Sequence, residues 1–301
     1  MNVTVTGASG FVGSLLTRKL LDTGYAVHVL GRRLGAGLPP EVHFSEWPSM
    51  DAEPPAESLA SADVVVHLAG EPVAQRWTAA ARRRIRDSRV DGTRNLVQAL
   101  SKLSRRPSVL VSASAIGYYG PRGDEVLAEN ASPGRDFLGK LCGEWEQAAL
   151  AAEALGIRVV LPRIGTVLGR GGALARMLPP FRFGLGGRLG SGKQWMSWIH
   201  VQDLIGLILF ALTNAALRGP VNATAPHPVT NLEFTHALAA ALHRPAMFFV
   251  PGFALRLALG EMATMVLTGQ RVVPAAAETA GFSFQYPDLA PALAGLLAGK
   301  T

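Results

Sequence analysis

TGASGFVG, residues 6–13, follows a short β-branched run (NVTVT, 2–6) and precedes a helical pattern that extends to Asp22. Each of its three glycines has a role that a side chain would obstruct. Gly7 allows a sharp turn, Gly10 lets a diphosphate approach the backbone, and Gly13 lets the helix pack on the strand. Free N–H groups and the dipole of the helix then face the diphosphate. The stretch therefore predicts a dinucleotide-binding turn made by Gly7, Ser9, Gly10, Phe11 and Val12.

Strands and helices alternate along the first half of the chain. Helices of this length between strands imply right-handed crossovers and a parallel sheet. We therefore predict an α/β fold with a Rossmann-like, doubly wound parallel sheet. The expected strands are 2–6, 25–30, 42–47, 62–70, 108–114 and 157–165, the last leaving the sheet, and the expected helices are 11–22, 79–101, 136–154 and 200–214.

The composition changes after residue 165. Residues 181–198 are rich in glycine and aromatic residues, and helical patterns recur near 231–243, 253–267 and 288–299. The economical interpretation is a smaller, mostly α C-terminal lobe that binds the substrate. The predicted dinucleotide domain comprises residues 1–165 and about 200–225, and the predicted substrate lobe comprises about 166–199 and 226–301.

Composition excludes several classes of protein. Apolar residues make up 49% and charged residues 17%, as in a globular chain. No run of about 18 uncharged apolar residues occurs, and no signal-peptide pattern opens the chain, so we expect a cytoplasmic protein without a membrane span. The single cysteine, Cys142, excludes an intrachain disulfide and a cysteine-based zinc site. We expect no bound metal.

The net charge of +7 invites nucleic acid as a partner. The densest group of arginines lies between residues 76 and 94, where Asp87 and Asp91 interrupt it. Only Trp77 offers an aromatic platform there, whereas single-strand binding uses several. We therefore do not expect nucleic acid to be the partner.

The end of the second strand indicates which dinucleotide the turn would bind. NAD requires a carboxylate there for the ribose hydroxyls, but this chain has Gly31, Arg32 and Arg33. A guanidinium binds a 2′-phosphate in a bidentate manner, and a carboxylate would repel it. The charge favours NADP(H) over NAD(H); the alternative is that both arginines are solvated loop residues.

Several motifs occur in the order of one known family. They are TGASGFVG, HLAG (67–70), SRVDGTRNL (88–96), VSASAIGYYG (111–120), GKLCGEWE (139–146), PRIGTVLG (162–169), WIHVQD (198–203) and GQRVVPAAAETAGFSFQYP (269–287). In this order the chain resembles the atypical extended short-chain dehydrogenases/reductases of the NAD-dependent epimerase/dehydratase superfamily. The closer resemblance, along nearly the whole chain, is to the SDR39U1-like epimerase family proteins with a C-terminal lobe of the DUF1731 type.

The resemblance implies a cofactor path along several segments. In this fold the HLAG strand end and the helix after it pass near the cofactor, with His67 as a wall residue. Arg182, Arg188 and Lys193 around the glycine-rich segment suggest an anionic small-molecule substrate. The further cofactor residues that the resemblance implies are His67, Leu68, Ala69, Gly70, Arg83, Ser88, Pro162 and Ile164.

The same resemblance places a catalytic helix at residues 136–146. Family members carry Tyr-x3-Lys there, with an acidic residue four positions further on. Lys140 and Glu144 fit the second and third positions, so Lys140 is the candidate to reach the nicotinamide ribose. Asp136 stands where the tyrosine would be; an ionised carboxylate cannot donate a proton. A solvated row of surface charges is the alternative interpretation.

Two kinds of side chain are candidates to replace the tyrosine. Ser114 occupies the family's Ser/Thr position and is a candidate to bind a substrate oxygen, or else it bonds the backbone. Tyr118, or Tyr119 beside it, is a candidate proton donor, or else an aromatic packing residue. His200, before Asp203, is expected to tie the two lobes together rather than to catalyse.

These observations predict an NADP(H)-dependent oxidoreductase or nucleotide-sugar-epimerase-like enzyme with an atypical site. Hydride would move between the nicotinamide and a carbonyl or secondary alcohol. The alternative is a catalytically silent protein that senses NADPH. We expect a monomer or homodimer that binds neither nucleic acid nor membranes.

Overall fold

The computed structural model describes residues 1–35 and 37–298 of the chain. Its main sheet is parallel throughout, in the order β13-β8-β5-β4-β1-β2-β3, with β6 paired to the end of β8. The strands of this sheet are β1 (Asn2–Thr6), β2 (Ala26–Gly31), β3 (His43–Glu46), β4 (Val64–His67), β5 (Val109–Ser112), β6 (Ser114–Ala115), β8 (Arg158–Ile164) and β13 (Gly219–Ala223).

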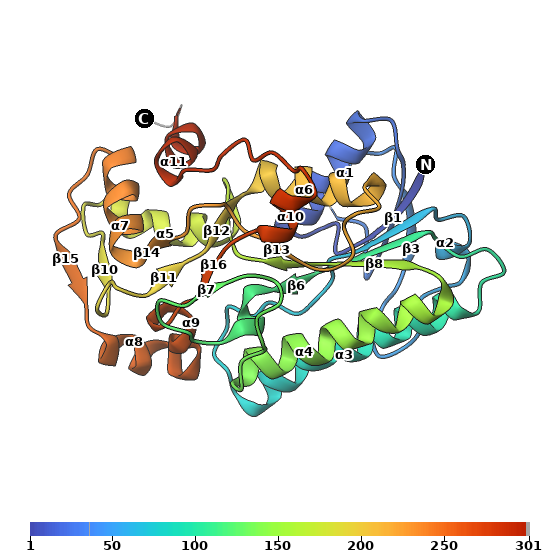
Figure 1. Ribbon diagram of the computed structural model, residues 1–301, viewed down its shortest axis with the longest axis horizontal. Helices are drawn as coiled ribbons and strands as arrows, with labels where there is room; N and C mark the ends of the chain where they lie inside the picture. The colour runs from blue at the N-terminus through green and yellow to red at the C-terminus, as the bar shows by residue number, and fades with distance from the viewer. Residues whose placement is uncertain (36, 299–301) are drawn as a thin grey trace.

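Helices cover both faces of this sheet (Figure 1). α1 (Phe11–Asp22) and α6 (Val201–Thr213) pack on one face, and α3 (Ala79–Ser101) and α4 (Phe137–Leu150) on the other. The strands are valine-rich and buried on both sides, as parallel strands between two helical layers must be. This arrangement confirms the predicted Rossmann-like doubly wound fold.

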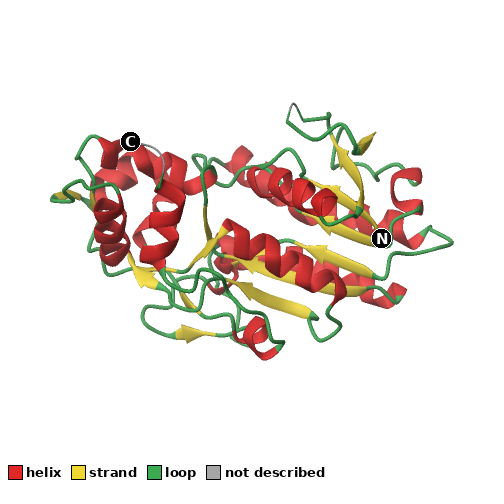
Figure 2. Cartoon of the chain, turned by 90° about the horizontal axis from the view of Figure 1, so that it is seen from above, coloured by secondary structure: helices red, strands yellow, loops and turns green. Residues whose placement is uncertain are grey.

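The remaining elements form a smaller helical region at one end of the molecule, with short strand pairs (Figures 1 and 2). The strand pairs are β9–β12, β10–β15, β11–β14 and β7–β16. Helices in this region are α5 (Gly172–Arg182), α7 (Asn231–Ala241), α8 (Gly252–Leu259), α9 (Thr264–Leu267) and α11 (Leu289–Leu297). α10 (Ala275–Thr279) packs beside α6 on the main sheet, and α2 (Glu57–Ala60) lies at the other end of the molecule. The strands of these short pairs are β7 (Val126–Leu127), β9 (Thr166–Leu168), β10 (Gly187–Leu189), β11 (Trp195–Met196), β12 (Trp198–His200), β14 (Val229–Thr230), β15 (Phe248–Val250) and β16 (Arg271–Val272).

One strand assignment was wrong. Residues 157–165 do not leave the sheet, because β8 lies inside it between β13 and β5. The pattern missed β13 as the partner on its outer side. The guanidinium groups of Arg158 and Arg163, within this strand, are held by hydrogen bonds to neighbouring elements. The division into two domains stays a prediction.

Candidate functional site

The glycine turn after β1 has room only for glycine. Gly7 has a φ of 73°, and a Cβ there would lie 2.7 Å from the carbonyl carbon of Leu68. A Cβ on Gly13 would lie 2.2 Å from the carbonyl oxygen of Gly7. Gly10 precedes α1 without a side-chain cap, so the N–H groups of the first turn face outward. Ser9 and Gly10 are exposed, as a diphosphate site requires.

The end of β4 lies against this turn. The main-chain N–H of Leu68 donates to Thr6, and that of Ala69 donates to the Thr6 hydroxyl. The hydroxyl of Ser88, on α3, accepts from the N–H of Glu71 and so fixes the chain just after Gly70. Leu68, Ala69, Gly70 and Ser88 therefore lie together around the glycine turn, as the motifs indicate.

The sequence analysis did not identify a partly buried cation, Arg89, which lies next to Gly70. Arg89 donates to the carbonyl oxygens of Glu71 and Ile85, at 2.9 and 3.2 Å. Its guanidinium lies over the ring of Trp145, 5.2 Å from the centroid. A Cβ on Gly70 would come within 3.2 Å of this group. Positive charge therefore lies directly under the loop that follows β4.

A second glycine cluster closes over α1. Gly169, Gly171 and Gly172 pack against the ring of Phe11, and a Cβ on Gly169 would lie 2.5 Å from that ring. This segment carries Arg170, which is exposed, next to the amino end of α1. The spacing of these glycines, between β9 and α5, was the signal that sequence reasoning passed over.

Arg32 and Arg33 follow β2 directly. Both side chains are exposed. Among the described residues neither forms a salt bridge. Gly31, the last residue of β2, pairs with Glu46 on β3. The placement suits contact with a ligand but equally suits solvated loop residues, so the structure leaves the two interpretations standing.

His67 does not line the expected cofactor path. Its ring is fully buried, with Nδ1 2.7 Å from the Thr6 hydroxyl and the ring of Trp47 nearby. Burial, and secondarily the charge of Arg89, lowers the pKa of His67 to about 4. The side chain points into the layer between the sheet and α3, so His67 supports the strand end from below. Of the other cofactor candidates, Arg83 is exposed on α3, Pro162 is buried in β8, and Ile164 packs in the same apolar cluster as Leu68.

The charged row on α4 faces away from the sheet. Asp136 is the N-cap and accepts from the N–H of Gly139. Lys140 is exposed, and Glu144 pairs with Arg86 of α3 at 2.8 Å. The structure therefore does not bring Lys140 together with Ser114 and Tyr118, and the surface-charge interpretation fits this row.

The row two residues further along faces inward. Leu138 lies beside Gly117, and the Glu146 carboxylate accepts from the Ser114 hydroxyl at 2.6 Å. Cys142, between them, is buried, and burial raises the pKa of its thiol to about 12. Leu138, Cys142 and Glu146 have the same four-residue spacing as the charged row and also end in an acidic residue. This inward row, and not the charged one, lies next to the ends of β5 and β6, but it contains neither tyrosine nor lysine.

A buried ion pair holds the centre of this region. Arg163 of β8 binds Glu146 through two bonds of 2.8 Å, and their side chains are only 2% and 5% exposed. Burial alone would lower the pKa of Arg163, but the Glu146 carboxylate outweighs it and raises the pKa above its usual value. Ser114 donates to the same carboxylate, so its hydroxyl proton is already engaged.

The two tyrosines differ in environment. Tyr119 is fully buried, donates to Asn222 and accepts from Arg163, and burial raises its pKa to about 12. The ring of Tyr118 lies under the Arg163 guanidinium, 3.5 Å from its centroid, and is partly exposed. Its hydroxyl forms no hydrogen bond to the described residues. Tyr118 is therefore the better placed of the two to reach a ligand.

His200 and Asp203 join α6 to the C-terminal segment. The His200 ring stacks on Tyr286 with centroids 3.8 Å apart. Asp203 accepts from the main-chain N–H groups of Gln285 and Tyr286. Burial lowers the pKa of His200 to about 4. This geometry agrees with a structural role for both residues.

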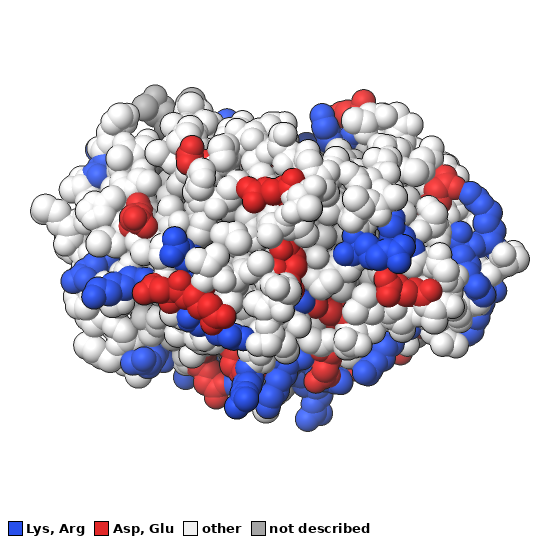
Figure 3. All heavy atoms as spheres, viewed as in Figure 1, with Lys and Arg blue, Asp and Glu red and all other residues white. Residues whose placement is uncertain are grey.

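The arginines of α3 are largely neutralised by neighbours. Arg86 pairs with Glu144, Arg94 with Asp91, and Arg82 with Glu261. Figure 3 shows blue and red atoms side by side along the edge where Figure 1 places α3. This interleaving does not form the continuous basic stripe that phosphate backbones bind.

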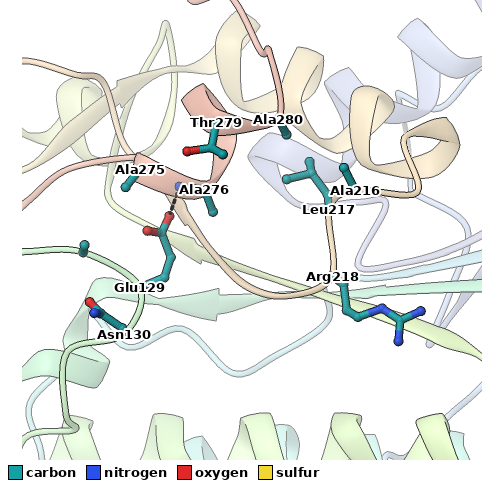
Figure 4. A pocket seen from close by; sticks show the side chains of 10 residues that line it. Glu129, Asn130, Ala216, Leu217, Arg218, Ala275, Ala276, Thr279 and Ala280 are labelled. Atoms are coloured by element: carbon teal, nitrogen blue, oxygen red, sulfur yellow. Dashed lines mark hydrogen bonds between the residues drawn. The ribbon is translucent and has the colours of Figure 1, made fainter.

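A surface cavity of about 440 Å³ lies apart from these residues, along the edge strand β13. Figure 4 shows Glu129 accepting from the N–H of Ala276, while Arg218 extends away from it. None of the predicted site residues lines it. A second hollow of similar volume includes Lys140, Arg94 and Glu144 on the outer side of α3 and α4.

Two absences concern the described residues alone. No helix within residues 1–35 and 37–298 is long and apolar enough to cross a membrane. The same part of the chain contains no group of three His, Cys, Asp or Glu residues arranged to hold a metal ion.

Comparison with known proteins gives this chain close relatives. The epimerase family protein YfhF of Bacillus subtilis is 40% identical over 100% of this chain and 99% of its own. The human epimerase family protein SDR39U1, crystallised with NADPH, is 34% identical, covers both chains fully and superposes with a TM-score of 0.89. A nucleoside-diphosphate sugar epimerase from Corynebacterium glutamicum is 35% identical over 99% of this chain and 58% of its own, with a TM-score of 0.79.

Two family models match separate parts of the sequence. The model of a domain of unknown function, DUF1731, matches residues 250–296. The model of the NAD dependent epimerase/dehydratase family matches residues 3–223, which include the glycine turn, the inward row of α4 and β13. The family resemblance inferred from the motifs is thus confirmed, and the chain belongs to the NAD dependent epimerase/dehydratase family.

Proposed function

We propose that this protein binds NADP(H) and transfers hydride between the nicotinamide and a carbonyl or secondary alcohol. The observation that carries the proposal is the glycine turn, where a Cβ on Gly13 would lie 2.2 Å from the Gly7 carbonyl oxygen. Side chains are excluded and uncapped N–H groups remain, which is the chemistry a diphosphate needs. The NADPH in the human relative supports the same cofactor here.

The cofactor fits the residues that surround the turn. The N–H groups at Phe11 and Val12 would hold the diphosphate, and Arg32 and Arg33 would bind the 2′-phosphate. Leu68, Ala69 and Gly70 would lie along the nicotinamide half, with the partly buried guanidinium of Arg89 beneath them. When bound, the cofactor supplies or accepts the hydride.

The chain's own residues must handle the proton. Ser114 donates to Glu146, so it positions the strand end rather than donating to substrate. Tyr118 has a hydroxyl with no partner among the described residues, and its ring lies on the Arg163 guanidinium. Because this hydroxyl is the one left without a partner, we assign Tyr118 as the proton donor and acceptor. Lys140, exposed on the outer face, takes no part.

The substrate class that we propose is a nucleoside-diphosphate sugar. Its support is the Corynebacterium relative, which is 35% identical over 99% of this chain and described as such an epimerase. The substrate would lie between the sheet's carboxyl edge and the segment that packs on Phe11.

The cofactor proposal is tested by calorimetric titration of NADPH and NADH. Replacing Arg32 and Arg33 together by alanine should weaken NADPH binding by roughly 100-fold and leave NADH unchanged, because two charge-assisted bonds are lost. A control is Arg105→Ala with Arg106→Ala, another adjacent pair, which precedes the amino end of β5, whereas Arg32 and Arg33 follow the carboxyl end of β2. Equal loss in both variants, or no binding of NADPH by the parent protein, would refute the assignment.

A second candidate function is NADPH binding without turnover. The observation that favours it is the inward row of α4, which holds Leu138 and Cys142 where the family's spacing calls for tyrosine and lysine. Loss of NADPH absorbance with nucleoside-diphosphate 4-keto sugars separates the two. Turnover that falls at least 100-fold in Tyr118→Phe supports the enzyme, and saturable NADPH binding with no turnover supports the silent protein.

A further inference from the structure

The end of the molecule farthest from the amino terminus exposes an unusual number of large apolar side chains (Figure 1). They come from three stretches: the turn after α5, the strand β15 with the residue before it, and α8. Such a concentration is rare on a protein that stays alone in water. The most exposed are Phe183 (80%), Leu185 (56%), Met247 (86%), Phe248 (51%), Phe249 (51%), Phe253 (72%) and Leu257 (81%).

These stretches are neighbours in the short sheet or along the chain, and we call them together the distal apolar face. β10 and β15 pair in parallel, with Gly187 opposite Phe248. The Arg244 side chain donates to the carbonyl of Arg182, which ties the end of α5 to the start of β15. α8 begins at Gly252, two residues after β15 ends, and none of its residues is buried.

α8 presents its apolar residues outward rather than inward. Phe253 and Leu257 are four residues apart, so they lie on one stripe of the helix, and both are more than 70% exposed. An ordinary surface helix buries such a stripe against its own core. This stripe is left for something outside the chain.

Basic residues predominate within the segments that form the distal apolar face. The segments 182–199 and 242–260 contain no Asp or Glu. Their basic residues are exposed, and the guanidinium of Arg188 lies over the ring of Phe249 at 4.9 Å. Figure 3 shows blue atoms beside white ones at this end, with red atoms of neighbouring segments also present. The exposed cations are Arg182, Arg188, Lys193, Arg244 and Arg256.

We propose that the distal apolar face docks on a lipid surface that carries anionic headgroups. Exposed aromatic and aliphatic side chains would enter the boundary between headgroups and acyl chains, while the surrounding cations contact the anionic headgroups. The protein would lie on the membrane without crossing it. A second copy is the weaker occupant, because a two-fold pairing of this face would bring the five cations of one copy towards the five of the other.

The docking proposal uses three residues that also suggested an anionic substrate, namely Arg182, Arg188 and Lys193. That prediction stands beside the docking proposal, since a nucleoside-diphosphate sugar is anionic. The docking proposal itself departs from the expectation that the chain binds no membrane.

Vesicle flotation tests the proposal with the full chain. Vesicles of phosphatidylcholine mixed with phosphatidylglycerol should carry the protein to the top of a gradient at low salt, and vesicles of phosphatidylcholine alone should not. Each cation near an anionic surface contributes about 1 kcal/mol, so Arg244→Ala with Arg256→Ala should lower partitioning by roughly 30-fold. The matched control, Lys19→Ala with Arg218→Ala, removes the same charge elsewhere and should float as the parent does.

The apolar contribution needs its own variant. Phe253→Ser with Leu257→Ser should also abolish flotation, while thermal unfolding and NADPH binding stay unchanged, because both side chains are exposed. Three results would overturn the proposal. They are no flotation of the parent protein, equal flotation on neutral vesicles, and a concentration-dependent dimer in sedimentation that the serine variant dissociates, which would assign the face to a second copy.

Discussion

The buried pair of Glu146 and Arg163 should contribute far more to folding than a surface pair of the same length. Replacing Glu146 by glutamine keeps the shape but leaves the Arg163 guanidinium charged in a site where both side chains are at most 5% exposed. Breaking one partner of a buried pair costs about 3–5 kcal/mol, because the remaining charge is uncompensated. We expect the free energy of unfolding to fall by that amount in urea titrations.

The same helix supplies a control of identical chemistry. Glu144 meets Arg86 at 2.8 Å, the distance that also separates Glu146 from Arg163, but the Glu144 side chain is 46% exposed. Glu144→Gln should therefore cost no more than about 1 kcal/mol. The two variants differ in burial and in the Ser114 hydroxyl, which donates to Glu146 alone.

A double variant separates lost attraction from stranded charge. Replacing Glu146 by leucine together with Arg163 by methionine removes both charges at similar volume, which should restore much of the stability lost in Glu146→Gln. The reasoning fails if Glu146→Gln costs no more than Glu144→Gln, since burial would then have no weight. It also fails if the double variant is as unstable as the single one with circular dichroism showing the native fold.

Three further outcomes follow from the geometry. Gly13→Ala should weaken NADPH binding at least 100-fold in calorimetry and lower the free energy of unfolding by about 1–3 kcal/mol, because its Cβ would lie 2.2 Å from a carbonyl oxygen. Gly143→Ala, where a Cβ meets open space, should instead raise stability slightly. His67, whose pKa burial lowers to about 4, stabilises the fold as a neutral ring, so this contribution is complete above about pH 6.5 and is lost as pH falls toward 4. Between about pH 6.5 and 4 the free energy of unfolding of the parent protein should fall by about 3 kcal/mol in urea titrations, and His67→Asn should not show this fall. Lys140→Ala should leave both NADPH binding and turnover within twofold of the parent, and a larger change would return this lysine to the site.

The helices whose apolar residues recur with a regular helical period could be predicted from the sequence. The boundaries expected for α1 and α3, residues 11–22 and 79–101, match the structure. Both helices show an apolar stripe of the right period between clear start and stop signals. β8 was misplaced because the sequence does not reveal β13 as its outer neighbour, nor that the two arginines of β8 bond to α4 and α6.

The α4 register shows why a motif match can be out of step. Asp136, Lys140 and Glu144 repeat every four residues, and so do Leu138, Cys142 and Glu146. The two rows are two residues apart, which on a helix turns them to different faces. Charge made the first row conspicuous, but only the position of the neighbouring strand end shows which row meets Ser114.

This register has a chemical consequence for the whole site. A hydroxyl that is to protonate a substrate oxygen needs a free proton and a neighbour that stabilises its anion. The Ser114 hydroxyl donates a hydrogen bond to Glu146, and the Tyr119 hydroxyl donates one to Asn222. Both hydroxyl groups therefore hold the structure of the site. Tyr118 alone among these three keeps a hydroxyl without a partner in the described chain while its ring rests on Arg163. The ion pair that fixes the fold at this point therefore also selects Tyr118 as the side chain whose removal decides between an enzyme and a silent binder of NADPH.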